Sequence, residues 1–148
     1  VSFRYFDWVL TRAATGVDPE APGVTEMWSV KDVVAHLIAH EHRTIEELRY
    51  AKRGERLPIK HAENDSFNDG AVYACRVMPF EMVREQRWRS YERVVAMIES
   101  LDEADFDPQS NVVKMLDDTI DGAVANNTYE HYNFHGAQIE EWLEDQGL

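Results

Sequence analysis

Apolar residues recur at helical spacing in four long segments of this sequence, and this pattern is the feature that most constrains its fold. The segments cover residues 3–15, residues 29–54, residues 79–101 and a last stretch from about Asn111 or Asp117 to Glu144. A period of about 3.6 residues places apolar side chains on one face of an α-helix, whereas a half-buried strand needs strict alternation. The pattern therefore predicts four main helices and gives no confident strand.

The second segment carries clear helix signals at both ends. Ser29 is a good N-cap, and Asp32 completes an acidic form of the capping box. Gly54 is a plausible stop, because glycine readily adopts the left-handed conformation that ends helices. The stripe between them consists of Val30, Val33, Val34, Leu37, Thr44, Ile45 and Leu48.

The third and fourth segments each leave one position of the inward face open. The face of the third comprises Phe80, Val83, Trp88 or Arg87, Tyr91, Val94, Val95, Ile98 and Leu101. The face of the last comprises Ile120, Val124, Asn127, His131, Phe134 or His135, Gln138 and Trp142. In the last segment these positions recur every three or four residues, a spacing that is typical of a helix-bundle seam. A shorter helical segment, residues 66–77, precedes the third.

Long helices joined by modest connections indicate an all-α fold. We expect an antiparallel four-helix bundle with a short extra helix in a connection. A chain of 148 residues has the length of one domain and can bury a core without disulfides. We therefore expect residues 1–148 to form a single domain. Bundles build their sites from inward side chains of facing helices, so histidines in the seam are of interest.

The charge balance argues against nucleic acid as a partner. The 28 acidic and 15 basic side chains give a net charge of −13, and such a surface repels phosphate backbones. No apolar run approaches the roughly 20 residues that cross a bilayer, and no secretory signal is visible, so we expect no membrane partner. Cys75 is the one cysteine, which fits a cytoplasmic location and a simple core role for that thiol.

Two histidines four residues apart, His131 and His135, lie in the last segment. Their spacing places both rings on one helix face, as where one helix holds a metal with two imidazoles. No glutamate directly follows His131, the first histidine of the pair, so the zinc-protease pattern is absent. The alternative is two half-buried histidines with polar partners, but an unpaired polar ring in a seam costs free energy. A catalytic metal usually needs a third protein ligand.

The second segment offers that third ligand, because His36 and His40 are again four residues apart. On a helical wheel His40 lies closer to the apolar stripe than His36. Periodicity alone therefore favours His40 as the inward ligand. We expect His42 and His61 to face solvent.

Three further residues are candidates for roles beside such a site. Asn127 lies one turn before His131, where it would orient a ligand or contact a bound cofactor or substrate, unless it is only a polar seam residue. Glu41 is a candidate general base or a hydrogen-bond partner of a metal ligand, although an exposed edge residue has the same pattern. Tyr132 would supply a proton or a hydrogen bond, unless it is only a core edge. The catalytic group itself stays unassigned.

Three stretches together resemble the DinB-like (damage-inducible B) superfamily: MWSVKDVVAHLIAHE, FNDGAVYACRVMPFEMVREQRWRSYERVVAMIESL and NNTYEHYNFHGAQIEEWL. The resemblance covers about residues 28–143 and is closest to the group that contains the colibactin self-protection protein. It implies a four-helix bundle with three histidines that bind a divalent ion. His36 matches the ligand from the second helix, and His131 and His135 match the pair from the last.

The resemblance favours His36 where the helical wheel favours His40. We follow the motif, because helix phases in bundles vary by tens of degrees. His40 stands at a position that is commonly aromatic in this group, which leaves it as a candidate extra ligand.

The resemblance also implies a function. It indicates a divalent-metal-binding enzyme that acts on a small molecule, by thiol-dependent transfer or isomerisation or by hydrolysis of an electrophile. The metal would be Zn, Ni or Fe, with a low-molecular-weight thiol as a candidate second cofactor. Two alternatives stay open: a self-protection protein that sequesters a small molecule without turnover, and an interaction bundle with incidental histidines. A homodimer is one candidate assembly.

Overall fold

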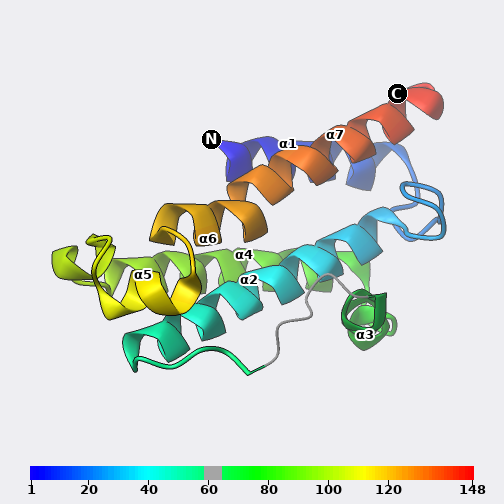
Figure 1. Cartoon of the computed structure of the whole chain (residues 1–148). Coiled ribbons are helices and arrows are strands. Elements are labelled where there is room, and N and C mark those ends of the chain that lie inside the picture. Colours follow the sequence, from blue (N-terminus) through cyan, green and yellow to red (C-terminus); the bar gives the residue numbers. More distant parts are fainter. Residues whose placement is uncertain (59–64) are drawn as a thin grey trace.

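Helices make up the framework of the protein (Figure 1). The computed structural model describes residues 1–58 and 65–148. The elements are α1 (Ser2–Gly16), α2 (Val30–Lys52), α3 (Asp65–Cys75), α4 (Phe80–Glu99), the 3-10 helix η1 (Glu103–Phe106), α5 (Asn111–Leu116), α6 (Ile120–Asn127) and α7 (Tyr129–Asp145). These described residues form no strand, only an isolated bridge between Thr25 and Trp28. The predicted all-α fold is confirmed.

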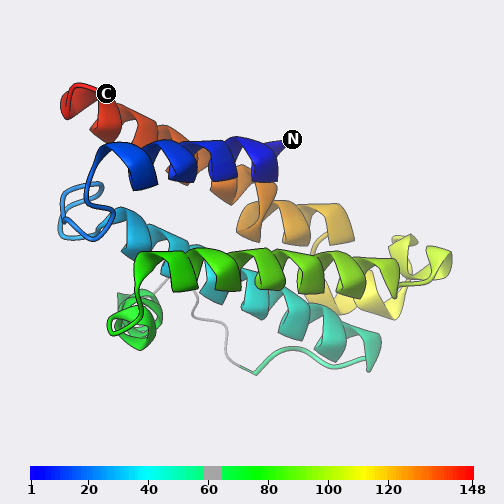
Figure 2. The same cartoon turned by 180° about the vertical axis from the view of Figure 1, so that it is seen from behind.

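The long helices α1, α2, α4 and α7 form the bundle, with α1 and α7 running one way and α2 and α4 the other (Figures 1 and 2). α1 packs against α7, and α2 packs against α4. Because α2 and α4 run in the same direction, the connection between them returns to the end of the bundle where α2 began. The short extra helix α3 lies in that connection. No helix in the described ranges has both the length and the apolar character of a membrane span.

Local signals fix both ends of α2, as the sequence predicts. The Ser29 hydroxyl accepts a hydrogen bond from the Asp32 N–H at 3.2 Å, and the Asp32 carboxylate accepts one from the Ser29 N–H at 2.9 Å. At the other end α2 stops at Lys52, and Gly54 follows with a φ of +74°. Glycine adopts this left-handed conformation without a steric penalty. The start and the end of α2 are therefore set by its own sequence.

The prediction of one continuous last helix was wrong. The segment divides into α5, α6 and α7, with breaks at Asp117, where φ is 57°, and at Thr128, where φ is −129° and ψ is −102°. The Thr128 hydroxyl donates a hydrogen bond to the Val124 carbonyl at 2.6 Å, a type of bond that often bends helices. Asn127, at the end of α6, is therefore out of register with the helical face that α7 continues.

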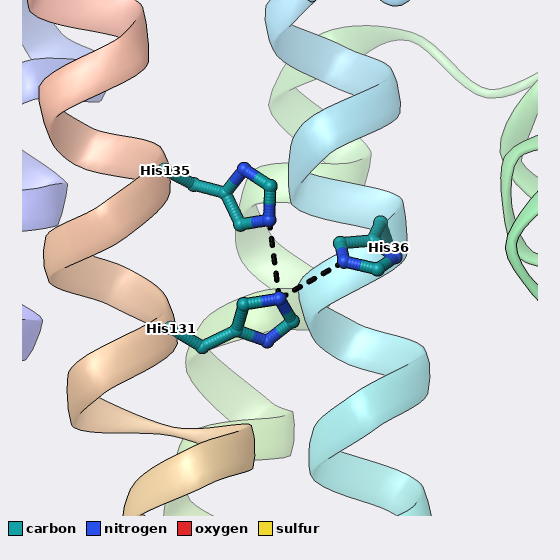
Figure 3. A group of neighbouring side chains, drawn as sticks. All are labelled: His36, His131 and His135. Atoms are coloured by element: carbon teal, nitrogen blue, oxygen red, sulfur yellow. Dashed lines mark hydrogen bonds between the residues drawn. The ribbon is translucent and has the colours of Figure 1, made fainter. Parts of the chain in front are cut away.

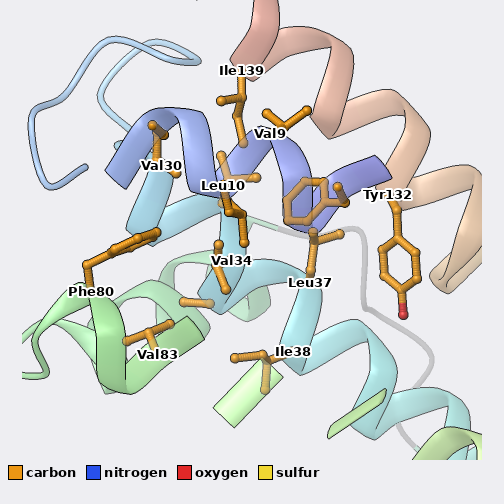
Figure 4. Packing of buried hydrophobic residues seen from close by; sticks show 14 of the residues in the cluster. Val9, Leu10, Val30, Val34, Leu37, Ile38, Phe80, Val83, Tyr132 and Ile139 are labelled. Atoms are coloured by element: carbon orange, nitrogen blue, oxygen red, sulfur yellow. The ribbon is translucent and has the colours of Figure 1, made fainter. Parts of the chain in front are cut away.

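Two apolar clusters hold the bundle together. The main core lies between α1, α2, α4 and α7, and its fully buried members include Leu10, Val34, Leu37, Val83 and Ile139 (Figure 4). A second cluster near the end of α2 consists of Leu48, Ala51, Val112, Ile120 and Val124. Each fully buried Leu, Ile or Val contributes roughly 1.5–3 kcal/mol to the stability of the fold. The main core thus joins α2 to α7, and the second cluster joins α2 to α5 and α6.

The structure also decides the two positions that periodicity left open. On α4, Arg87 is fully buried, whereas Trp88 is 41% exposed. On α7, His135 is 6% exposed, whereas Phe134 is 61% exposed. In both cases the polar residue faces inward. The bundle interior therefore holds polar side chains as well as apolar ones.

Candidate metal centre

Three histidine side chains from two facing helices meet at one point of the bundle (Figure 3). His36 comes from α2, and His131 and His135 come from α7. Nε2 of His131 lies 3.0 Å from Nε2 of His36 and 3.1 Å from Nε2 of His135. One ring nitrogen from each residue lies within 4.8 Å of the other two. The fold thus brings together the three histidines that the motifs single out.

Hydrogen bonding alone does not satisfy this triad of His36, His131 and His135. A neutral imidazole has one N–H and one lone pair, so Nε2 of His131 cannot form full hydrogen bonds with two neighbouring Nε2 atoms. The Nδ1 atoms of His36 and His131 are buried without a hydrogen-bond partner among the described residues. A single cation accepts three lone pairs at once, and nitrogens around tetrahedral zinc are about 3.3 Å apart. The donor set therefore fits a divalent metal ion.

Burial keeps these rings in the neutral form that binds metals. Loss of hydration, together with the neighbouring imidazoles, lowers the pKa of His36 to about 3 and the pKa of His131 to about 2, from an ordinary value of 6.5. Burial also lowers the pKa of His135. A metal competes with protons for the same lone pair. At neutral pH, protons offer little competition here.

Gln138, which the sequence pattern marks only as a residue of the bundle seam, holds the ring of His135 in place. Nδ1 of His135 lies 2.7 Å from Oε1 of Gln138, one turn further along α7. Because this oxygen is an acceptor, Nδ1 carries the proton and Nε2 keeps the lone pair that faces the other two rings. Such outer contacts fix the orientation of metal-binding histidines. The signal was present as a polar residue three positions after a histidine in the seam.

His40 and Asn127 form a hydrogen-bonded pair beside the triad. His40 is 6% exposed, so both His36 and His40 face inward. Its Nδ1 lies 2.9 Å from Oδ1 of Asn127, which therefore contacts His40 rather than His131. His42 is exposed, as the periodicity predicts. His61 lies outside the described residues.

Glu41 and Tyr132 face the core, where they contact each other. Glu41 is 0% exposed, so the alternative of an exposed edge position is wrong, and Tyr132 is 1% exposed. The Tyr132 hydroxyl donates a hydrogen bond to the Glu41 carboxyl. Burial raises the pKa of both groups. Neither residue belongs to the described lining of the cavity next to the triad, so the structure gives no support to a catalytic role for them there.

A cavity of about 730 Å³ lies beside His36 and His131. Its other lining residues are His40, Arg43, Glu47, Asn68, Leu116, Asp118, Ala123, Asn126 and Asn127. Within this set, the Arg43 guanidinium donates a hydrogen bond to the Glu47 carboxylate at 2.8 Å. Small-molecule sites typically have volumes of about 300–1,000 Å³. The triad therefore borders a polar space that is large enough for a small molecule.

Comparison with known protein families gave a match over most of the chain. The sequence model of the DinB superfamily matches residues 10–139. Searches of curated proteins and of solved structures found no match. The matched region includes all three histidines of the triad.

Proposed function

The chain belongs to the DinB superfamily, and on that premise we propose that it is a divalent-metal-binding enzyme that acts on a small molecule. His36, His131 and His135 would hold the ion. The observation that carries this proposal is the convergence of three neutral imidazoles, two of them buried and that of His131 partly buried, beside a cavity of about 730 Å³. The proposed metal is Zn, Ni or Fe, all of which accept imidazole ligands.

The residues around the proposed centre would have different roles. The triad supplies three neutral donors, and Gln138 orients the ring of His135 through its contact at 2.7 Å. A divalent ion held in this way supplies Lewis-acid activation of a thiol, a water molecule or a carbonyl group. The polar cavity beside His36 and His131 would bind the substrate and limit access of bulk water. Asn127 would act through His40 rather than on the cofactor directly.

The reaction that we propose is thiol-dependent transfer or isomerisation, or hydrolysis of an electrophile. Support comes from the donor set, since three imidazoles leave room at the ion for a substrate or a low-molecular-weight thiol. We also propose that the chain is related to the colibactin self-protection group, because its two histidine motifs resemble those of that group. A protein of that kind that only sequesters a small molecule would use the same cavity. The one cysteine, Cys75, supports a cytoplasmic location.

Metal binding is the first test. Protein purified without an affinity tag should contain a divalent metal, or take up one equivalent of Zn²⁺ or Ni²⁺ in a calorimetric titration. His131→Ala should weaken this binding by about 100-fold or more, because it removes the central donor. His42→Ala is the matched control, since it removes an exposed histidine of α2. Failure of the wild-type protein to bind metal after reconstitution would refute the proposed centre.

Thermal unfolding, together with an assay of electrophile consumption, distinguishes an enzyme from a protein that only sequesters a small molecule. Metal should raise the melting temperature of the wild-type protein but not that of His131→Ala. A small electrophile that stabilises both proteins equally, without being consumed, would support a sequestering protein. Consumption of the electrophile by the metal-loaded wild type alone would support the enzyme.

A further inference from the structure

We propose that His40 is a fourth ligand of the metal ion, so that one pair of imidazoles from α2 and one pair from α7 surround it. This inference rests on the proposed function, because it needs an ion at His36, His131 and His135. It changes the centre from three protein donors with an open position to four. The case rests on the placement of the ring, the identity of its free nitrogen and its burial.

The ring of His40 is as close to two members of the triad, His36 and His131, as the members of the triad are to one another. Its centre lies 4.4 Å from that of His36 and 4.7 Å from that of His131. For comparison, the ring centres of His131 and His135 are 4.7 Å apart. His40 follows His36 by one turn on α2, as His135 follows His131 on α7. Two helices therefore present matching pairs of imidazoles to one another.

The hydrogen bonds around Asn127 fix which nitrogen of His40 carries the proton. The Asn127 amide N–H₂ donates to the Ala123 carbonyl at 3.3 Å, which leaves Oδ1 to face His40. That oxygen can only accept, so Nδ1 of His40, at 2.9 Å, must be the donor. Nε2 of His40 therefore holds a lone pair. This is the same arrangement that Gln138 imposes on His135.

Nothing that the structure describes uses this lone pair. Nε2 of His40 is buried and has no hydrogen-bond partner among the described residues, while the whole side chain is 6% exposed. A buried acceptor without a partner costs free energy that water or a ligand would recover. A cation shared with the neighbouring rings of His36 and His131 would satisfy it without any new protein group.

A fourth imidazole decides what the centre can do. Zinc prefers four ligands in tetrahedral geometry, so four histidines leave it no open position, whereas an ion with more coordination positions keeps some for substrate. His40 also lines the cavity. It therefore occupies the side of the centre from which a small molecule approaches. With zinc the centre would hold the ion, and turnover would require His40 to leave it.

The ring-conserving variant His40→Phe tests the inference, since it keeps an aromatic ring and removes both nitrogens. Zn²⁺ affinity should fall about tenfold or more, at least the loss caused by removing an outer partner of a ligand. X-ray absorption at the zinc edge should count four imidazoles in the wild type and three in the variant. Circular dichroism and thermal unfolding of the metal-free proteins check that both are folded.

Two further comparisons make the result decisive. His42→Ala should leave both the affinity and the imidazole count unchanged. An unchanged affinity and count in His40→Phe would overturn the inference, and His40 would then be a cavity residue that contacts substrate at most. A wild-type protein that binds no metal would instead refute the proposed function itself. Three imidazoles in the wild type would also overturn the fourth ligand while leaving the triad intact.

Discussion

A buried contact between two single residues, Glu41 and Tyr132, couples the helices that carry the histidine triad. Glu41 follows His40 on α2, and Tyr132 follows His131 on α7, so the hydrogen bond between them ties together the two backbones that carry the histidines. Arg87 of α4 lies next to this bond, with its guanidinium carbon 4.8 Å from the centre of the Tyr132 ring. A polar contact in a dry core has a specific geometry, whereas apolar contacts tolerate sliding. We infer that it sets the rotation of α7 against α2.

Removal of the Tyr132 hydroxyl should therefore destabilise the fold. Tyr132→Phe leaves the Glu41 carboxyl buried with one partner fewer, which costs about 1–3 kcal/mol in the free energy of unfolding. Urea unfolding of the metal-free protein measures this. Tyr129→Phe is a matched control, because that tyrosine is 37% exposed and donates a hydrogen bond to the exposed Asp121. Equal stability of the two variants would contradict a structural role for the buried bond.

At the scale of the helices, sequence signals predict some helix ends and miss others. The start and end of α2 were predictable, because Ser29, Asp32 and Gly54 act through contacts with their own neighbours in the chain. The breaks at Asp117 and Thr128 were not, because neither residue is a glycine or a proline. The helical periodicity of the last segment, which starts at Ile120, continues across Thr128. Packing of α5 and α6 against α2 outweighs that periodicity.

The cap of α2 gives a prediction at this scale. Ser29→Ala removes the side chain that accepts the Asp32 N–H at 3.2 Å and should lower the free energy of unfolding by about 1 kcal/mol. Chemical denaturation checks the value. Ser100→Ala is the control, since Ser100 is exposed at the end of α4 and caps no helix start. A loss in Ser29→Ala no larger than in Ser100→Ala would show that the cap does not stabilise α2.

At the scale of the whole molecule, the sequence predicted which histidines converge better than what surrounds them. His36, His131 and His135 carry the motifs, whereas periodicity alone favoured His40 over His36 and left His135 open against Phe134. Gln138, and the pairing of Asn127 with His40, depend on the rotation of α7 and on the break before it. Those are set by contacts between distant parts of the chain. The fold class was therefore readable from periodicity, while the lining of the cavity was not.

Burial of neutral imidazoles makes the stability of the whole metal-free protein depend on pH. The pKa of His36 is about 3 and that of His131 about 2 in the folded state, against 6.5 for an ordinary histidine. The unfolded chain therefore binds protons that the folded chain does not. The stability contributed by neutral burial is complete above about pH 6.5 and is lost as the pH falls toward these folded values. The loss approaches about 1.4 kcal/mol per pH unit for each histidine.

Urea unfolding in the presence of a chelator at pH 7.5, 6 and 5 should show this fall. His131→Ala should reduce the slope of unfolding free energy against pH, because one suppressed titration is gone. Ser29→Ala serves as the control, since it lowers stability at every pH without removing a titrating histidine and so keeps the wild-type slope. The same slope in His131→Ala as in wild type would mean that His131 takes up its proton over the same pH range in the folded and the unfolded protein. The lowered pKa of His131 in the folded protein would then be wrong, and with it the weak competition of protons with a metal below about pH 6.5.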